Sequence, residues 1–195
     1  MPLPAKTGLF FGSFNPIHCG HLMIASYMVE YTDLEQVWFV VSPHNPLKEK
    51  ATLLADHHRL AMVNLAIGED PRFKSSNIEF KLPQPSYTID TLAYLAEKYP
   101  GKEFVLIAGS DILSTFHKWK NFGELLRQYR IYLYPRPGNP AGRFDDHPSI
   151  IRVEAPLITI SSSFIRQGIR DRKNMRYFLP DNVWKYIDEM HFYEK

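Results

Sequence analysis

The sequence predicts an α/β protein built on a parallel β-sheet that is covered by helices on both faces. Short apolar runs alternate along the chain with segments of helical periodicity, which is the order expected for β-α-β units. These runs are apolar at every position rather than at every second one, as in strands that are buried on both faces. The chain has 195 residues, of which 45% are hydrophobic, enough for one domain with a substantial core.

Four apolar runs are predicted to be strands of this sheet. The first is Gly8–Phe11, and the turn-forming residues that follow it end the strand. Val37–Val41, Glu103–Ala108 and Ile131–Tyr134 have the same character. The segment Phe73–Lys81 is also predicted to be extended, from a less regular pattern.

Helices separate these strands and follow the last of them. In the first helix, apolar residues recur at helical spacing from Leu22 to Val29. Gly68 ends the second helix, and Pro100 ends the third. The predicted helices are His18–Tyr31, Ala55–Ile67, Thr88–Tyr99, a short helix that opens at Ser161, and Pro180–Met190.

The connections between these elements are predicted loops within one domain. Residues 42–54 are polar and contain two prolines, and residues 135–148 contain four prolines and two glycines. We find no internal repeat and no linker that would separate two domains. Residues 1–195 are therefore predicted to form one Rossmann-like domain, in which residues from about 160 to 195 are a small C-terminal helical cap packed on the sheet.

Composition narrows the classes of partner. The 23 Lys and Arg residues and 21 Asp and Glu residues give a net charge of +2, which excludes a polybasic nucleic-acid-binding surface. The single cysteine, Cys19, excludes an internal disulfide and a four-cysteine zinc site, and it fits a reducing cytoplasm. No apolar run approaches the ~20 residues of a membrane span, and Met1–Phe11 lacks the features of a signal peptide. We expect a cytoplasmic protein.

Polar clusters follow three of the predicted strands. They are Gly12–His21, Ser42–Lys48 and Gly109–Asp111. In an open parallel sheet, ligands bind beyond the carboxyl ends of the strands, where these three clusters are expected to meet. The sequence therefore predicts a ligand site at this edge.

The first cluster predicts a site for a polyphosphate. His18 and His21 are three residues apart at a helix start, so they share one face of the helix. The helix start itself favours an anion through its unpaired N–H groups and its dipole. Gly12 and Gly20 carry no side chain, which we expect to leave room for a ligand close to the backbone. Such a histidine pair on its own is more often structural, and no third ligand for a zinc ion is evident nearby.

The second cluster is Ile160–Arg166. Ser161 is a predicted helix cap, and the nearby hydroxyl and amide groups can hold phosphate oxygens. Arg166 falls in the first or second turn, where its guanidinium is expected to grip a phosphate bidentately. Alone, this cluster is more often plain structure, and its significance comes from its pairing with the two histidines.

The two clusters together resemble the nucleotidyltransferases with a His-x-Gly-His motif and a downstream Ile-Ser-Ser-x-x-Ile-Arg motif. Further matches resemble the bacterial nicotinate mononucleotide adenylyltransferases and extend the likeness over nearly the whole chain. The loop before Lys48 departs from the more familiar family version in the placement of His44 and Asn45. The further matching segments are Pro85–Thr88, Asp90–Leu92, Ile107–Asp111, Trp119, Arg136–Gly138 and Leu179–Val183.

This resemblance implies adenylyl transfer from ATP to nicotinate mononucleotide, giving deamido-NAD and pyrophosphate in NAD biosynthesis. It implies Mg²⁺ bound through the ATP phosphates, and no metal held by the protein alone. The residues with catalytic roles would be His18, His21, Lys48 and Arg166. Those that bind ATP would be Phe11, Gly12, Ser13, Phe14, His18, His21, Gly109, Asp111, Arg136, Ser161, Ser162, Ser163 and Arg166, and those that bind the mononucleotide would be Ser42, Lys48, Tyr87, Thr88 and Trp119.

Other functions stay open at this point. One is adenylyl transfer to nicotinamide mononucleotide, or to another phosphate acceptor such as phosphopantetheine, although that family usually has Thr at the position of His18. A cytidylyltransferase shares the two histidines, but its Arg-Thr-x-Gly-Ile-Ser motif is absent. A non-enzymatic nucleotide sensor would bind ATP without turnover. The oligomeric state is not indicated by the sequence.

Overall fold

A computed structural model describes residues 5–43, 53–138, 144 and 146–194. Within these residues, six strands form one parallel sheet with the order β3-β2-β1-β4-β5-β6. This order, with one change of direction between β1 and β4, is typical of a Rossmann-like fold, as predicted. The strands are β1 (Ala5–Gly12), β2 (Gln36–Val41), β3 (Phe73–Ser76), β4 (Lys102–Gly109), β5 (Arg130–Tyr134) and β6 (Ile150–Arg152).

The five predicted helices are all present, with ends within a few residues of the predicted ones. Gly68 ends the second at φ 56°, in the left-handed region that glycine adopts without strain. The α-helices are α1 (Cys19–Tyr31), α2 (Asp56–Ile67), α3 (Thr88–Lys98), α4 (Phe122–Gln128), α5 (Ser162–Arg170) and α6 (Asp181–Glu189). The 3₁₀ helices are η2 (Ile78–Lys81), η3 (Ser110–Ser114), η4 (Phe116–Lys118) and η5 (Arg176–Phe178).

Side chains alternate between two cores, one on each face of the sheet. On β1, Phe10 belongs to the core that includes residues of α1, α2, α5 and α6, whereas Leu9 belongs to the core beneath α3 and α4. On β4, Ile107 and Leu106 divide in the same way. Because both faces are covered, the central strands contain continuous apolar runs, such as Leu9–Phe11 and Val37–Val41, and this is why they could be predicted.

Three local predictions differ from the structure. The extended segment Phe73–Lys81 is wrong beyond Ser76: β3 ends there, and η2 begins at Ile78. The helix α4 and the strand β6 were not predicted, because seven and three residues are too short to show a period. β6 lies at the edge of the sheet and pairs only with β5 among the described strands.

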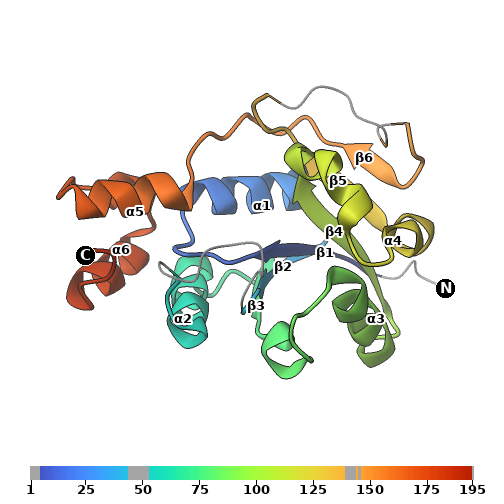
Figure 1. Ribbon diagram of the computed structural model, residues 1–195, viewed down its shortest axis with the longest axis horizontal. Helices are drawn as coiled ribbons and strands as arrows, with labels where there is room; N and C mark the ends of the chain where they lie inside the picture. Colours follow the sequence, from blue (N-terminus) through green and yellow to red (C-terminus); the bar gives the residue numbers. More distant parts are fainter. Residues whose placement is uncertain (1–4, 44–52, 139–143, 145, 195) are drawn as a thin grey trace.

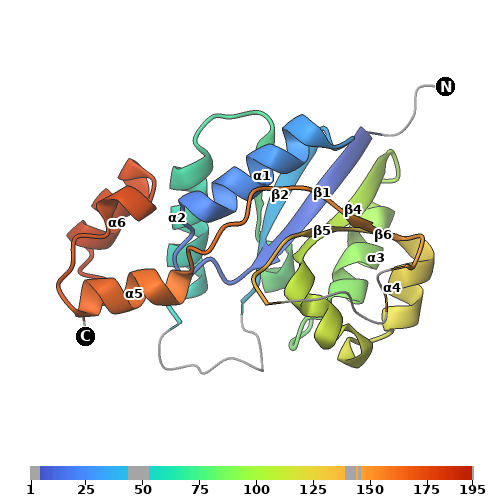
Figure 2. The ribbon, with the colours of Figure 1, turned by 90° about the horizontal axis from the view of Figure 1, so that it is seen from above.

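The last two helices lie at one end of the molecule. In Figures 1 and 2, α5 and α6 lie beyond α1 and α2, at the end opposite α3 and α4. Ile165 on α5 and Val183 on α6 are fully buried in the same core as α1 and α2. Nδ1 of His58 on α2 and the hydroxyl of Tyr186 on α6 are 2.8 Å apart. Among the described residues, no helix combines the length and the apolar character that crossing a membrane requires.

The point where the chain changes direction in the sheet lies between β1 and β4. β1 pairs with β2 on one side and with β4 on the other. The chain therefore extends the sheet from β1 to β3 in one direction, and then crosses back to β4 and extends it in the other. The loops beyond the carboxyl ends of these two strands diverge and leave a crevice between them. The turn after Gly12 and the segment after Gly109 therefore border the predicted site.

Candidate active site

The turn between β1 and α1 presents two stacked histidines. α1 begins at Cys19, with His18 as the residue that precedes its first turn. The imidazoles of His18 and His21 are stacked, with their centroids 3.7 Å apart. The backbone N–H of His18 donates to Nδ1 of His21 at 3.2 Å. Nδ1 of His21 is therefore an acceptor, which places the proton of the neutral ring on Nε2.

His18 is a neutral side chain near pH 7. His18 is 4% exposed. This burial, together with the positive charge of Arg136, lowers the pKa of the imidazole to about 4. The sequence pattern predicted that the two histidines and the helix start bind a polyphosphate. The structure supplies a neutral hydrogen-bonding ring at His18, because a charged imidazole would lose its hydration there.

The two glycines of the turn serve the packing of the protein itself. A Cβ at Gly12 would lie 2.9 Å from Cζ of Phe14, so the ring of Phe14 fills the space that we expected to remain beside a ligand. A Cβ at Gly20 would lie 2.7 Å from Cγ2 of Ile158 and 3.1 Å from Nδ1 of His18. Gly20 therefore allows the close approach of these two side chains to α1, and a larger residue would displace His18.

The start of α5 is tied to this turn. Ser161 caps the helix as predicted, accepting a hydrogen bond from the N–H of Phe164 at 3.2 Å. The hydroxyl of Ser162 donates to the carbonyl of Pro16 at 2.9 Å. Two clusters whose contacting residues are 146 positions apart in the sequence therefore lie side by side in the fold.

Arg166 on α5 also contacts this turn. Its Nη1 donates to the carbonyl of Asn15 at 2.8 Å, and its Nη2 donates to the hydroxyl of Ser163 at 3.3 Å. The guanidinium thus already makes protein contacts at both terminal nitrogens. Burial lowers the pKa of Arg166, but from so high a value that the side chain stays charged.

A cavity of about 560 Å³ lies between the β1–α1 turn, the start of α5 and the end of β5. This volume falls in the range of sites for small molecules. Phe10, Asn15, Leu53 and Tyr134 also line it and were not predicted. The predicted residues that line it are Phe11, Gly12, Ser13, Phe14, His18, His21, Arg136, Ser161, Ser162, Ser163 and Arg166.

Three buried nitrogen atoms of this lining have no hydrogen-bond partner among the described residues. They are Nδ1 of His18, Nε of Arg136 and Nε of Arg166. The other such side-chain atom in the described part of the chain is the hydroxyl of Thr7 on β1, which does not line the cavity. Buried polar groups are nearly always paired, so a group of them around one cavity indicates a polar ligand that completes their hydrogen bonds. Two of the three belong to cations, which favours an anion.

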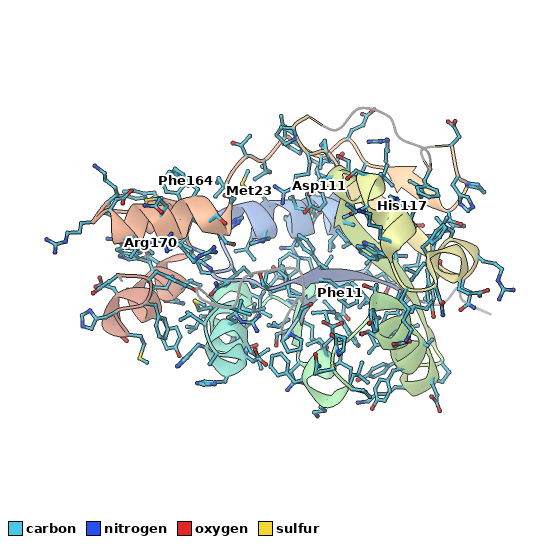
Figure 3. All side chains as sticks on the ribbon, viewed as in Figure 1. Phe11, Met23, Asp111, His117, Phe164 and Arg170 are labelled. Atoms are coloured by element: carbon cyan, nitrogen blue, oxygen red, sulfur yellow. The ribbon has the colours of Figure 1, made fainter. Side chains whose placement is uncertain are left out.

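Arg136 joins the cavity to the segment after β4. Its guanidinium lies over the ring of Tyr134, 5.3 Å from the centroid, and its backbone N–H donates to the hydroxyl of Ser110 at 3.0 Å. A Cβ at Gly109 would clash with Oδ1 of Asp111 at 2.3 Å and with Cγ of Arg136 at 2.9 Å. Gly109 and Asp111 therefore lie beside the cavity without lining it. Figure 3 marks Asp111 and His117 on the segment that follows β4, and Phe11 on β1.

Four of the residues predicted to bind the mononucleotide, Ser42, Tyr87, Thr88 and Trp119, do not line this cavity. Tyr87 is exposed, precedes α3, and has the ammonium of Lys120 4.7 Å from its ring centroid. Thr88 is the first residue of α3, and Tyr87 caps the helix without a side-chain hydrogen bond. Trp119 is half-buried and packs on Phe116, with the ring centroids 5.4 Å apart. Lys48 lies outside the described residues.

A buried carboxylate, which sequence reasoning missed, links several of these residues. Glu79 is 3% exposed, and its Oε1 accepts a hydrogen bond from the hydroxyl of Thr91 at 2.9 Å. Its carboxylate also interacts with the side chains of Ser42 and Ser86. Burial raises the pKa of Glu79, and these hydroxyl groups act in the opposite direction. Glu79 thereby connects the end of β2, where Ser42 lies, to the start of α3.

Arg59 is a second residue that sequence reasoning missed. Its residue is fully buried in α2, and its guanidinium donates to the carbonyls of Ser13, Ser42, Pro43 and Leu54 at 2.6 to 2.9 Å. It also pairs with Asp56. One buried cation thus joins the turns after β1 and β2. An arginine on the helix face of Met62 and Val63, three and four residues away, was the available signal.

A second cavity, of about 570 Å³, lies away from these residues. It is bordered by α5, α6 and the residues after each of them, and the predicted site residues do not line it. Among the described residues, no group of three or more His, Cys, Asp or Glu side chains is arranged to hold a metal ion.

A family model and several curated proteins are similar to this chain. Residues 9–168 match the family described as cytidylyltransferase-like. The chain is 56% identical to a protein of Christiangramia forsetii named probable nicotinate-nucleotide adenylyltransferase, over 97% of this chain and 98% of that protein. A protein of Bacteroides thetaiotaomicron with the same name is 48% identical, over 94% of this chain and 91% of that protein.

Solved structures of other proteins share this fold. The structure of Plasmodium falciparum nicotinic acid mononucleotide adenylyltransferase complexed with NaAD superposes on this chain with a TM-score of 0.80. The superposition covers 97% of this chain and 98% of that one, at 18% sequence identity. At this identity the likeness shows the fold alone, and that fold is the one described above.

Proposed function

Because this chain belongs to the cytidylyltransferase-like family, and within it to the nicotinate-nucleotide adenylyltransferases, we propose that it transfers the adenylyl group of ATP to nicotinate mononucleotide. A phosphate oxygen of the mononucleotide forms a bond to the α-phosphorus of ATP, and the bond from that phosphorus to the bridging oxygen of the β-phosphate breaks. The products are deamido-NAD and pyrophosphate. The reaction belongs to NAD biosynthesis and takes place in the cytoplasm.

The observation that carries this proposal is the set of unpartnered nitrogens around the cavity. His18, Arg136 and Arg166 line the same cavity, and each has one buried nitrogen without a partner among the described residues. A triphosphate supplies several acceptor oxygens and negative charge in one ligand. It therefore meets the requirement that these three side chains share.

The chemistry needs little proton transfer. The attacking phosphate is largely ionised at neutral pH, so a strong general base is not required. The protein contributes by aligning the two phosphates and by stabilising the charge that develops on the leaving pyrophosphate. In this proposal, His18 and His21 bind phosphate oxygens at the reacting centre, and Arg166, with Lys48, holds the pyrophosphate. A neutral His18 can donate one hydrogen bond, from the ring nitrogen that carries its proton.

Mg²⁺ is proposed to enter with ATP. The described side chains that line the cavity include no Asp or Glu, whose carboxylates are the usual protein ligands of Mg²⁺. This donor set suits an ion held by phosphate oxygens and water, with Asp111 as the nearby carboxylate of the segment after β4. When bound, the ion would neutralise part of the phosphate charge.

The mononucleotide is proposed to bind between the end of β2 and the start of α3. The first N–H groups of α3, at Thr88 and Ile89, can donate to the carboxylate of the pyridine ring, because Tyr87 supplies no side-chain cap to this helix. Trp119 is proposed to stack on the ring. Glu79 supports this proposed mononucleotide site by holding the side chains of Ser42 and Ser86, which border the site.

A turnover assay with a panel of acceptors tests the function. Purified protein is incubated with ATP, Mg²⁺ and, separately, nicotinate mononucleotide, nicotinamide mononucleotide or phosphopantetheine. Released pyrophosphate is measured, and each product is identified by its mass. We expect deamido-NAD to form fastest. ATP binding without turnover of any acceptor would instead indicate a nucleotide sensor.

A further inference from the structure

The segment after α6 returns to the β1–α1 turn. His191 and Tyr193 adopt φ values of 54° and 68°, in the left-handed region that residues other than glycine seldom adopt. This conformation folds the chain back beside α6, where Phe192 packs on His58 with the ring centroids 4.8 Å apart. The hydroxyl of Tyr193 then donates to Oδ1 of Asn15 at 2.7 Å, although the two residues are 178 positions apart.

Asn15 is the residue of the turn that accepts hydrogen bonds from several other elements. It lines the cavity, and it is 4% exposed. Its carbonyl accepts a hydrogen bond from Nη1 of Arg166 at 2.8 Å. Its Oδ1 accepts a second hydrogen bond from the N–H of Leu54, at 3.3 Å, in addition to the shorter one from Tyr193. Asn15 thus joins α5, the segment before α2 and the segment after α6.

Two cations lie close to the hydroxyl of Tyr193. Arg59 and Arg166 both act on it electrostatically, and both also hold carbonyls of the β1–α1 turn, at Ser13 and Asn15. Burial raises the pKa of Tyr193 and outweighs the opposite effect of the two cations, so the hydroxyl keeps its proton at neutral pH. It therefore acts as a constant donor to Asn15.

We propose that Tyr193 is a positioning residue for adenylyl transfer, which acts by holding the side chain of Asn15 and thereby the turn that carries His18. The inference rests on the proposed function, because it assigns a residue to the same site. It adds an element that the motifs do not include, since Tyr193 follows the last helix and lines neither cavity.

The physical reason lies in the alignment of the reacting phosphates. Without the hydroxyl, Oδ1 of Asn15 retains the longer hydrogen bond from Leu54, and the turn gains freedom next to His18. Small displacements of groups that position a substrate reduce turnover more than they reduce binding. We therefore expect kcat to fall and the KM for ATP to change little.

The substitution Tyr193→Phe removes the hydroxyl and keeps the ring. We expect kcat to fall about three- to tenfold, the factor that corresponds to one net hydrogen bond. Tyr186→Phe is the matched control, because it also removes a half-buried hydroxyl, which lies 2.8 Å from Nδ1 of His58 and away from the cavity. Tyr177→Phe controls for the same change at an exposed site, where the residue is 89% exposed. Both controls should retain the wild-type kcat.

Coupling to Asn15 separates positioning from general stability. In an Asn15→Ala background, Tyr193→Phe should have no further effect on kcat, whereas in an Asn15→Asp background, which keeps an acceptor oxygen, it should still reduce kcat. Thermal unfolding of every variant is measured, and assays are run well below the lowest Tm. The acceptor used is the one that the wild-type protein turns over fastest, so failure with nicotinate mononucleotide contradicts the proposed function and leaves this test intact.

Four results would overturn the inference. The first is an unchanged kcat in folded Tyr193→Phe. The second is an equal loss in Tyr186→Phe, which would indicate a general effect of loosening the segment around α6. The third is a Tyr193→Phe protein that does not fold. The fourth is an effect that persists in full in the Asn15→Ala background, since either of these last two would show that the hydroxyl acts other than through Asn15.

Discussion

The imidazoles of His18 and His21 lie almost parallel, with their centroids 3.7 Å apart and their planes inclined by 25°. Two charged rings at this separation would repel each other strongly. The lowered pKa of His18, to about 4, leaves this ring neutral near pH 7. The pair therefore combines a neutral donor with a second ring, that of His21, whose Nδ1 accepts from the backbone of His18.

Loss of either histidine should impair turnover severely. We expect His18→Ala and His21→Ala each to lower kcat by about a hundredfold or more, as when one charge-stabilising donor is removed from a reacting centre. The measurement is steady-state turnover with ATP and nicotinate mononucleotide, with circular dichroism to verify folding. Near-normal turnover in either folded variant would contradict its assigned role.

The buried His18 should make stability depend on pH in the mildly acidic range. In the unfolded chain its imidazole titrates near 6.5, and in the folded protein near 4. Between these values the unfolded state binds the proton and the folded state does not, so stability falls as the pH falls from about 6.5 to about 4. From the linkage relation, this group removes about 2 kcal/mol by pH 5.

Urea unfolding of wild type and His18→Gln at pH 7 and pH 5 measures this contribution. Glutamine keeps a polar side chain and does not titrate, so the wild-type protein should lose about 2 kcal/mol more than the variant over this interval. Equal losses in the two proteins would show that His18 is not the group responsible.

Arg166 should matter more for ATP than for the mononucleotide. Arg166→Ala removes the cation at the start of α5, the support of the Asn15 carbonyl and one of the three unpartnered nitrogens. We expect the affinity for ATP and for pyrophosphate to fall by roughly 1.5–3 kcal/mol, the range for a charge-assisted hydrogen bond. Separate titrations of ATP and nicotinate mononucleotide decide the point, and a selective loss of mononucleotide affinity would place Arg166 at the other end of the site.

The start of α3 should make the protein prefer the acid form of the mononucleotide. A carboxylate accepts hydrogen bonds from the first N–H groups of the helix, whereas the NH₂ of a carboxamide would face donors. An unpaired donor costs ~1–3 kcal/mol, or roughly ten- to a hundredfold in specificity. The ratio of kcat/KM for nicotinate and nicotinamide mononucleotide measures this preference. Equal values would indicate an enzyme of dual specificity.

Local pattern was sufficient for most of the fold. The strands that begin near Gly8, Val37, Glu103 and Ile131 were predicted because their two buried faces require continuous apolar runs. The prediction over Phe73–Lys81 was wrong beyond Ser76, because β3 at the sheet edge is short and carries little apolar pattern. Short elements such as α4 and β6 depend on tertiary packing and leave no period in the sequence.

The sequence by itself contains the motifs at His18, His21 and Arg166 that resemble the family, and the spacing of the two histidines predicted that they share one helix face. The tertiary structure alone decided the neutral state of His18, which follows from burial and the charge of Arg136. It also decided the contacts of Arg59 and Tyr193 with the β1–α1 turn, which join residues 46 and 178 positions apart. Desolvation and long-range hydrogen bonds depend on which segments the fold brings together, and no local spacing encodes that.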